Sequence, residues 1–208
     1  MKLIVIGLDG LSYNMLRQFD VDFPYLSKTR AEGVSGDLMS VDTPTTIPAW
    51  TSFATGKDPG SHGVHNMNTV SHEYDYAPVT SNKDDAAVYD LLDNSLFLNL
   101  PASAGRVPAA DNTFVESSLL EKTKDEMVPD ELKSLTSYDS YNPMHDHSLK
   151  QRPSAYRKHL LEIINSRKHF AREAFETHDP QLGFVLFSAT DWAGHMLSKL
   201  TSEKKQKA

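Results

Sequence analysis

The stretch that decides the fold is KLIVIGLDG, residues 2–10. Its apolar, β-branched run closes with Asp9 and Gly10, and this predicts a buried parallel strand that ends in a loop. The next residues, LSYNMLRQF at 11–19, carry apolar side chains at helical spacing. A strand, an Asp-Gly turn and a helix in this order are typical of the opening of an α/β unit.

The same patterns continue along the chain and predict one α/β domain. Further strands are expected at 33–41, 95–101 and 181–191. Further helices are expected at 84–94, 154–179 and 192–208, of which 154–179 has the clearest apolar stripe. Between 102 and 153 Pro, Ser, Asp and Asn are frequent, so long loops with short elements are expected there.

Composition narrows the class of protein. The chain has 208 residues, enough for one sizeable domain, and it contains no cysteine, which excludes disulfides, thiolate metal sites and cysteine nucleophiles. A formal charge of −7 argues against a nucleic-acid partner, because a phosphate-backbone binder needs a basic surface. The N-terminal apolar run is too short for a signal peptide or a membrane span, so we expect a cytoplasmic protein without a membrane partner.

Two predicted strands end in an acid, at Asp9 and Asp191. Ligands of open parallel sheets bind outside the carboxyl ends of the strands, so both acids should face the same edge. The loop TPTTIPAW at 43–50 follows another predicted strand and leads to the same edge. We therefore expect Asp9, Thr46, Asp191 and His195 to converge.

Each of these residues also has an ordinary structural interpretation. Asp9 alone suits a turn, and the Asp-x-Asp pattern of haloacid-dehalogenase-type phosphatases is excluded because Gly7 occupies the earlier position. Thr46 suits a helix cap, but a hydroxyl at a helix start also lies in a positive potential that favours a nucleophile and a bound phosphate. Asp191 and His195, four residues apart in DWAGH, suit zinc, or else a helix cap and a surface histidine.

Two other histidine segments are interpreted as structural. His62, in GSHGV, stands between a small residue and glycine, and we expect it to be buried and supporting rather than a metal ligand. The segment MHDH at 144–147 contains metal-binding residue types but lies in a polar region, so we expect a solvated loop.

Four segments together resemble the alkaline phosphatase superfamily, and most closely its type I phosphodiesterase/nucleotide pyrophosphatase branch. They are VIGLDG at 5–10, PTTIPAW at 44–50, TGKDPGSHGV at 55–64 and ATDWAGH at 189–195. The resemblance implies a three-layer α/β/α fold with a mostly parallel sheet. It implies a metal-dependent hydrolase of phosphodiesters or phosphomonoesters, nucleotides among them, with two divalent metal ions that are most often Zn²⁺.

By the same resemblance Thr46 would attack phosphorus and, with Asp9, bind one metal, while Asp191 and His195 would bind the other. Asn66 would hold a phosphate oxygen of the substrate, although it falls one residue short of the usual spacing. The motifs do not distinguish nucleotide, phosphodiester, phosphomonoester or sulfate substrates.

The resemblance also shows a departure. In the family a later strand ends in an Asp-His pair and a further His follows, and these complete the two metal sites, but this sequence ends at Ala208. Residues 1–208 therefore resemble a single incomplete catalytic domain, with the C-terminal part missing, and we expect the chain as given to be inactive. It would be a truncated enzyme, half of a split enzyme that needs a complementing chain, or a non-catalytic binding protein that retains the fold. Uncovered sheet edges would favour self-association.

Overall fold

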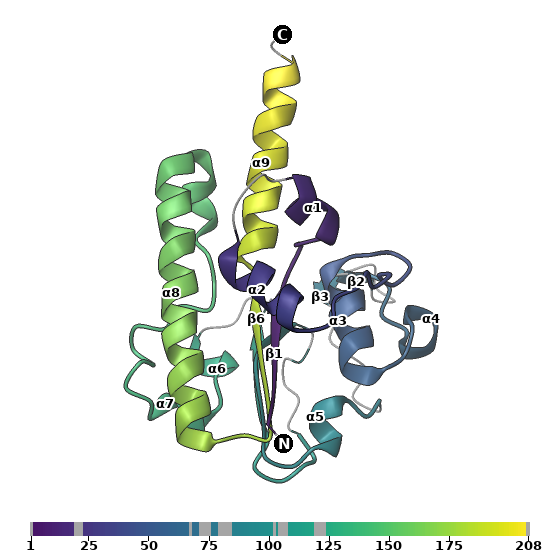
Figure 1. Ribbon diagram of the computed structural model, residues 1–208, viewed down its shortest axis with the longest axis vertical. Coiled ribbons are helices and arrows are strands. Elements are labelled where there is room, and N and C mark those ends of the chain that lie inside the picture. Colours follow the sequence, from purple (N-terminus) through teal and green to yellow (C-terminus); the bar gives the residue numbers. More distant parts are fainter. Residues whose placement is uncertain are drawn as a thin grey trace.

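The computed structural model describes residues 2–18, 23–66, 68–70, 76–78, 85–101, 103, 108–118 and 124–206, and its centre is a parallel sheet (Figure 1). The strands lie in the order β1-β6-β4-β5. Their bounds are Leu3–Leu8 for β1, Leu182–Phe187 for β6, Ser95–Pro101 for β4 and Phe114–Ser118 for β5. A separate antiparallel pair is formed by β2 (Asn68–Val70) and β3 (Tyr76–Pro78).

Helices cover the sheet on two sides. In Figure 1 the long α8 lies on one side, α3 and α5 lie on the other, and α9 extends beyond the sheet. The helix bounds are Tyr13–Gln18 for α1, Pro24–Glu32 for α2, Thr46–Thr55 for α3, Pro59–His62 for α4, Val88–Leu91 for α5, Lys124–Met127 for α6, Asp130–Lys133 for α7, His147–Gln151 for the 3-10 helix η1, Pro153–His178 for α8 and Ala189–Gln206 for α9. Among the described residues no helix is both long and apolar enough to cross a membrane.

The first strand and the last strand are neighbours. β1 pairs with β6 in parallel, in a register that sets Leu3 against Leu182 and Leu8 against Phe187. This pairing joins the two ends of the domain, so the residues that follow both strands emerge at the same edge of the sheet.

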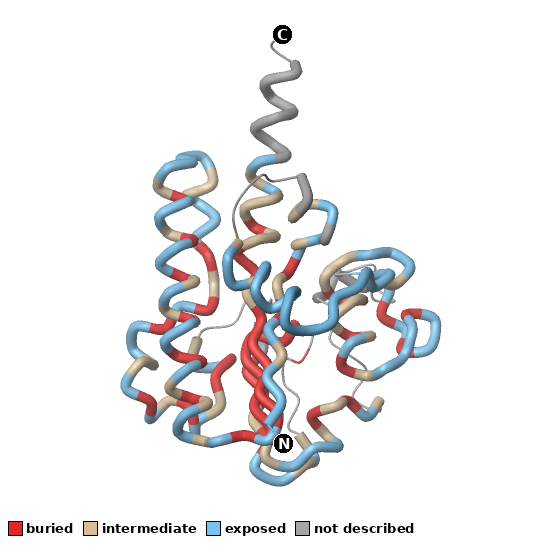
Figure 2. Tube along the Cα trace, viewed as in Figure 1, coloured by how far each residue is buried: buried red, intermediate tan, exposed pale blue. Residues whose placement is uncertain are grey.

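Each face of the sheet has its own apolar core, shown as the red centre of Figure 2. On one face Leu96, Leu98 and Val185 pack against α8 residues such as Phe170 and Ala174. On the other face the packing is made by Phe97, Phe184, Leu186, Ala54 and the half-buried Trp50. Alternate strand residues therefore face opposite helical layers, and the predicted three-layer α/β/α arrangement with a parallel sheet is confirmed.

A buried polar network lies between β4, β5 and α8. The Glu116 carboxylate accepts hydrogen bonds from the Asn99 backbone N–H and from the Tyr141 hydroxyl, the latter at 3.1 Å. Asn99 adopts φ 60°, at the point where the β4–β5 register shifts, and its side-chain amide donates to Tyr141 at 2.7 Å. The buried Arg167 guanidinium is the cation that offsets the charge of Glu116.

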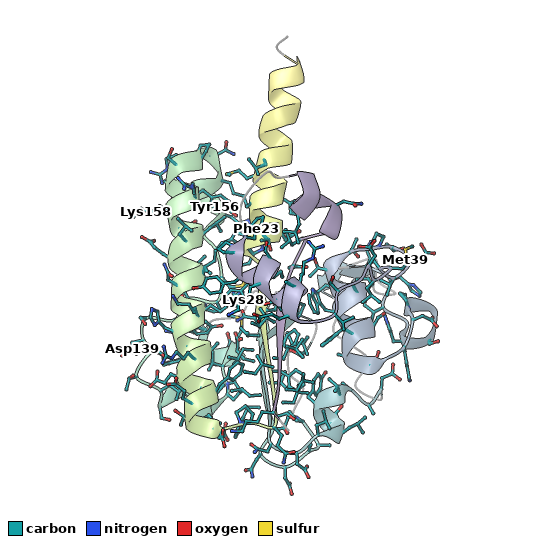
Figure 3. All side chains as sticks on the ribbon, in the orientation of Figure 1. Phe23, Lys28, Met39, Asp139, Tyr156 and Lys158 are labelled. Atoms are coloured by element: carbon teal, nitrogen blue, oxygen red, sulfur yellow. The ribbon has the colours of Figure 1, made fainter. Side chains whose placement is uncertain are left out.

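The expected strand at 33–41 is wrong. These residues form no strand, and Val34, Leu38 and Met39, the last labelled in Figure 3, are more than nine-tenths exposed. Strand residues need a neighbouring strand to bond their backbone groups, and the described residues offer none here. The two glycines of GVSGDLMSV, Gly33 and Gly36, also weaken an isolated strand.

Other elements differ in their bounds. The strand expected at 181–191 ends at Phe187, and α9 begins at Ala189, so Asp191 lies in the first turn of a helix. The helix expected at 84–94 is shortened to α5, where the Asp90 carboxylate accepts from the Ala87 N–H and Leu92 is already extended. The strand β5 lies in the region 102–153, where short elements among long loops were expected.

The predicted burial of the first strand is wrong, because β1 is at the edge of the sheet and its Leu3, Ile4 and Ile6 are more than half exposed. Phe19, Asp84 and residues 207–208 lie outside the described residues.

The buried Glu116 predicts a pH-dependent stability. Burial raises its pKa from the ordinary 4.5 to about 7, so the folded chain keeps this proton to higher pH than the unfolded chain. The stability it contributes is present below pH 4.5 and is lost as the pH rises through about 7. We expect the free energy of unfolding of Glu116→Gln, relative to that of the wild type, to increase by on the order of 3 kcal/mol between pH 5 and pH 8. Urea denaturation at the two pH values measures this difference.

The matched control is Glu173→Gln. Glu173 accepts hydrogen bonds from Thr136 and Ser137, which lower its pKa to about 2. The stability that Glu173 contributes is present above its unfolded pKa and is lost only as the pH falls through about 2. The change in the free energy of unfolding caused by Glu173→Gln should therefore be equal at pH 5 and pH 8. A constant difference for Glu116→Gln across this range would contradict the assignment.

Candidate functional site

A cavity of about 410 Å³ opens at the carboxyl edge of the sheet, and it contains all the residues predicted to converge. Its lining consists of Asp9, Gly10, Ser40, Pro44, Thr45, Thr46, Ala49, Asp191 and His195. The structure thus brings together residues from the two ends of the chain and from the Thr/Pro loop. Their chemical roles remain predictions at this stage.

Asp9 follows β1 and is held from several directions. Its backbone N–H donates to the Phe187 carbonyl at 3.0 Å, which extends the β1–β6 ladder, and its carbonyl accepts from the Thr190 hydroxyl. Its carboxylate accepts from the Trp50 indole N–H at 3.2 Å. Burial raises the pKa of Asp9, the Trp50 hydrogen bond opposes this, and the negative charge of Asp191 adds to the rise.

Gly10 lies close against the start of α9. Its φ is +67°, a conformation that favours glycine, and a Cβ placed here would lie 2.9 Å from both Cα and Cβ of Asp191. Only a residue without a side chain allows the two acids to be this close. The glycine of the Asp-Gly dipeptide is therefore required for the contact with Asp191 as well as for the turn.

Thr46 is the first residue of α3, and Thr45 is its N-cap. The first helical turn leaves the N–H groups of Thr46 and Ile47 without intrahelical acceptors, because the first such bond is from Ala49 to the Thr45 carbonyl, and Pro48 has no N–H. The hydroxyl of Thr45 is buried without a hydrogen-bond partner in the part of the chain that the structure describes. The loop therefore presents hydroxyls and free donors where an anion is favoured.

Asp191 and His195 lie one turn apart on α9. The His195 Nε2 and the Asp191 Oδ1 are 3.4 Å apart, and the side chains are 73% and 26% exposed. Ser188, not Asp191, accepts the first helical N–H bond, from Trp192, so the alternative in which Asp191 caps the helix is not supported. Both side chains reach the cavity from the same face of the helix.

The donors of the cavity suit a divalent metal in kind but fall short in number. Carboxylate, imidazole and hydroxyl groups are ligands of zinc and related ions. Asp9 with Thr46, and Asp191 with His195, would supply two donors for each of two ions, whereas a catalytic zinc normally has three protein ligands. Across the described residues no group of three or more His, Cys, Asp or Glu side chains is placed to hold a metal.

Asn66 is not brought to the site. It is exposed beyond α4 and is not among the described residues that line the cavity. Its role in binding a phosphate oxygen therefore rests on the sequence resemblance alone.

The two other histidine segments differ in outcome. His62 is buried, its Nδ1 accepts from the Val64 N–H at 3.1 Å, and its Nε2 therefore donates to the Ser52 hydroxyl at 2.9 Å, so the structural interpretation is confirmed. The solvated loop expected at 144–147 is wrong for His145, which is buried and stacked on Trp192 with ring centroids 4.1 Å apart. His145 is buried because Trp192 of α9 provides an aromatic surface for it to stack on, and the polar composition of the segment does not reveal this partner.

Sequence reasoning missed the residues that support the site. Trp50, Thr190 and Ser40 all contact or line it, and none has a chemistry that marks it in advance. The one usable signal was the position of Trp50, which lies four residues after Thr46 and so on the same face of the helix.

Comparison with known proteins gives one match. The model of the family described as type I phosphodiesterase / nucleotide pyrophosphatase matches residues 3–207, nearly the whole chain. No curated protein and no solved structure matches it.

The close contact between Gly10 and Asp191 predicts that a methyl group added at Gly10 strongly lowers the free energy of unfolding. Gly10→Ala and Gly56→Ala both place alanine at φ +67°, but Gly56 has nothing within 4 Å of its added Cβ. Each variant should lose about 1 kcal/mol from the left-handed backbone. Gly10→Ala should lose on the order of 1–3 kcal/mol more in urea denaturation, because Asp191 must move. Equal losses in the two variants would show that the close approach does not limit the fold.

Proposed function

Because the chain belongs to the type I phosphodiesterase / nucleotide pyrophosphatase family, we propose that its cavity is the hydrolytic site of a metal-dependent phosphoesterase. The observation that carries the proposal is the convergence of Asp9, Thr46, Asp191 and His195 in one cavity at the carboxyl edge of the sheet. The substrates would be small-molecule phosphodiesters or phosphomonoesters, nucleotides among them. A cytoplasmic location and the absence of nucleic-acid or membrane partners remain expectations from the sequence.

The charges of the cavity support a requirement for cations. Asp9 and Asp191 place two carboxyl groups beside the space that a phosphate group would occupy, and like charges repel. The start of α3 attracts an anion, but its partial charge of roughly half a unit does not balance two carboxylates. A phosphate ester therefore binds favourably only after cations have neutralised the acids.

The proposed metal ligands are divided between two elements of the fold. Asp9 and Thr46 would hold one divalent ion, and Asp191 and His195 would hold the other, with Zn²⁺ as the expected metal. When bound, two such ions stabilise the charges on the attacking and leaving oxygens of phosphoryl transfer. Asn66 is retained as a proposed phosphate ligand on the basis of the resemblance alone.

Thr46 is proposed as the nucleophile. The Asp9 carboxylate, fixed by Trp50, lines the same cavity as Thr46, where it would orient the hydroxyl. As the Thr46 oxygen bonds to phosphorus, the bond from phosphorus to the leaving oxygen breaks, and the proton lost by the Thr46 hydroxyl is taken up through solvent by the departing alcohol. Water then cleaves the phosphothreonine ester and restores the hydroxyl. The N–H groups of Thr46 and Ile47 lie where they stabilise charge on the phosphate oxygens.

A second function is favoured by the number of donors. With two protein ligands for each ion, the 208-residue chain holds cations loosely, and without rigid cations Thr46 keeps the low reactivity of an ordinary hydroxyl. The chain by itself would then be a non-catalytic binding or interaction protein that retains the family's fold.

The 208-residue chain should be inactive or nearly so when assayed alone with Zn²⁺. The reason is the incomplete donor set, and the measurement is release of aryl alcohol from an aryl phosphodiester and an aryl phosphomonoester. Thr46→Ala is the control for contaminating enzymes, because it removes the nucleophile and leaves the buried helix start unchanged. Metal-dependent turnover that disappears in Thr46→Ala would show that the site is complete without further ligands.

Zinc binding by calorimetry tests the site without relying on activity. His195→Gln should weaken Zn²⁺ binding by about tenfold or more, because it removes one of only two donors to its ion. His147→Gln is the matched control, since His147 is exposed and lies outside the cavity. An equal loss in both variants would indicate adventitious surface binding and would remove the support for the proposed metal pair.

A further inference from the structure

Gly7 is a glycine inside a strand, and its backbone conformation does not require it. It belongs to β1 and pairs with Leu186 of β6 in a regular parallel register. Its φ is not among the positive values that favour glycine in this chain. Glycine weakens a strand, and inside one it often marks a place where another group approaches the backbone closely.

The space beside Gly7 is taken by the indole of Trp50. A Cβ added at Gly7 would lie 2.9 Å from the Cη2 of Trp50 and 2.6 Å from the Cδ1 of Leu186, closer than packed side chains allow. Leu186 is fully buried whereas Trp50 is half-buried, so the indole is the group that a methyl group would displace. The missing side chain of Gly7 therefore lets the ring lie directly against β1.

The same indole reaches the acid that follows the strand. Gly7 and Asp9 are two residues apart and both buried, so they lie on the same face of the sheet. The far end of the indole, at Cη2, lies against Gly7, and the Nε1 at the other end donates to the Oδ1 of Asp9 at 3.2 Å. The space at Gly7 and the hydrogen bond at Asp9 thus depend on one position of the ring.

We propose that Gly7 and Trp50 are positioning residues for the metal ion assigned to Asp9. Gly7 provides the space for the indole, and the indole holds Oδ1 so that Oδ2 is the oxygen offered to the ion. The inference rests on the proposed function, because it requires a cation at Asp9. Hydrogen-bond partners behind metal-binding side chains are typically worth about 10–100-fold in metal affinity.

Tryptophan suits this role for two reasons. Its indole nitrogen donates a hydrogen bond and accepts none, so it orients the carboxylate without competing for the ion. Trp50 also lies one helical turn after Thr46 on α3. One helix therefore carries the proposed hydroxyl ligand and fixes the proposed carboxylate ligand, Asp9.

Gly183 provides a matched control. It is a glycine of the neighbouring β6, and a Cβ there would lie 3.0 Å and 3.1 Å from two ring atoms of Phe175. Phe175 belongs to α8, on the other face of the sheet, and neither residue lines the cavity. Gly183→Ala therefore crowds the sheet in a similar way, but away from Asp9.

Zinc calorimetry tests the proposal, with Asp9→Asn identifying the ion that Asp9 holds. Trp50→Phe keeps an aromatic ring and removes the N–H donor, so it should raise the dissociation constant of that ion by about tenfold or more. Gly7→Ala should do the same by displacing the indole. Gly183→Ala should leave the dissociation constant unchanged.

A double variant shows whether Gly7 acts through Trp50. A phenyl ring is too short to reach the position of the Trp50 Cη2, so adding Gly7→Ala to Trp50→Phe should cause no further loss of zinc affinity. A general disturbance of β1 would instead weaken binding further. Trp50→Phe inserts no extra atoms, so it tests the proposal even where Gly7→Ala does not fold.

Fluorescence reports on the contact between Trp50 and Asp9 directly. In the Trp192→Phe protein Trp50 is the only tryptophan. Zn²⁺ should change its emission, because the ion neutralises the carboxylate to which the indole is bonded. Asp9→Asn and Gly7→Ala should each abolish this change.

The outcomes separate this inference from the proposed function. Zinc binding that depends on Asp9 but is unchanged in Trp50→Phe would overturn the positioning role and leave the proposed function standing. Equal losses in Gly7→Ala and Gly183→Ala, or a further loss in the double variant, would overturn the role of Gly7. Zinc binding that does not depend on Asp9 would contradict the proposed function and this inference with it.

Discussion

The parallel pairing of β1 with β6 is the constraint on which the rest of the structure depends. It joins strands from the two ends of the chain, and its register places Asp9 next to the end of β6. Without it the residues of the cavity would belong to separate parts of the chain. Such long-range pairing orders much of the chain before its contacts form, so it is expected to form late in folding. Gly10 then sets how closely the end of β1 approaches α9, because its contact with Asp191 leaves no room for a side chain.

A buried arginine connects this pairing to the helical layer. The Arg167 guanidinium donates to the Leu186 carbonyl at 2.8 Å and to the Pro143 carbonyl at 2.7 Å, so one side chain joins α8 to β6 and to the segment before η1. A buried charge is costly unless it is hydrogen-bonded and balanced. Glu116 supplies the balancing charge, and its raised pKa shows that burial dominates over the attraction of the arginine. The network therefore fixes the positions of its members more than it adds to stability.

Sequence periodicity and residue order were sufficient for the elements that bury apolar faces. The strand positions of β1 and β4 and the helix α8 follow from local patterns. The convergence of the four site residues was predicted from strand ends and is found, but only Asp9 directly follows a strand: Asp191 lies in the first turn of α9, and within the described residues 33–45 no strand precedes the loop that carries Thr46. The strand expected at 33–41 failed because a strand needs a partner, which no local pattern supplies. His145 and Glu116 were missed because their burial depends on Trp192 and Arg167, which are distant in the sequence.

Both tryptophans of the chain support the candidate site: Trp50 supports Asp9, and Trp192 supports the neighbouring Asp191. Trp50, on α3 with Thr46, donates to Asp9 and packs edge-on against Phe184 in the sheet. Trp192, beside Asp191, stacks on His145 and lies 5.9 Å from the Arg167 guanidinium. Large aromatic side chains with few rotatable bonds hold their neighbours in place at low entropic cost. Each tryptophan thus anchors an acid from a different end of the chain to the packed core, so that the separation between Asp9 and Asp191 is set by the core and not by the exposed loops.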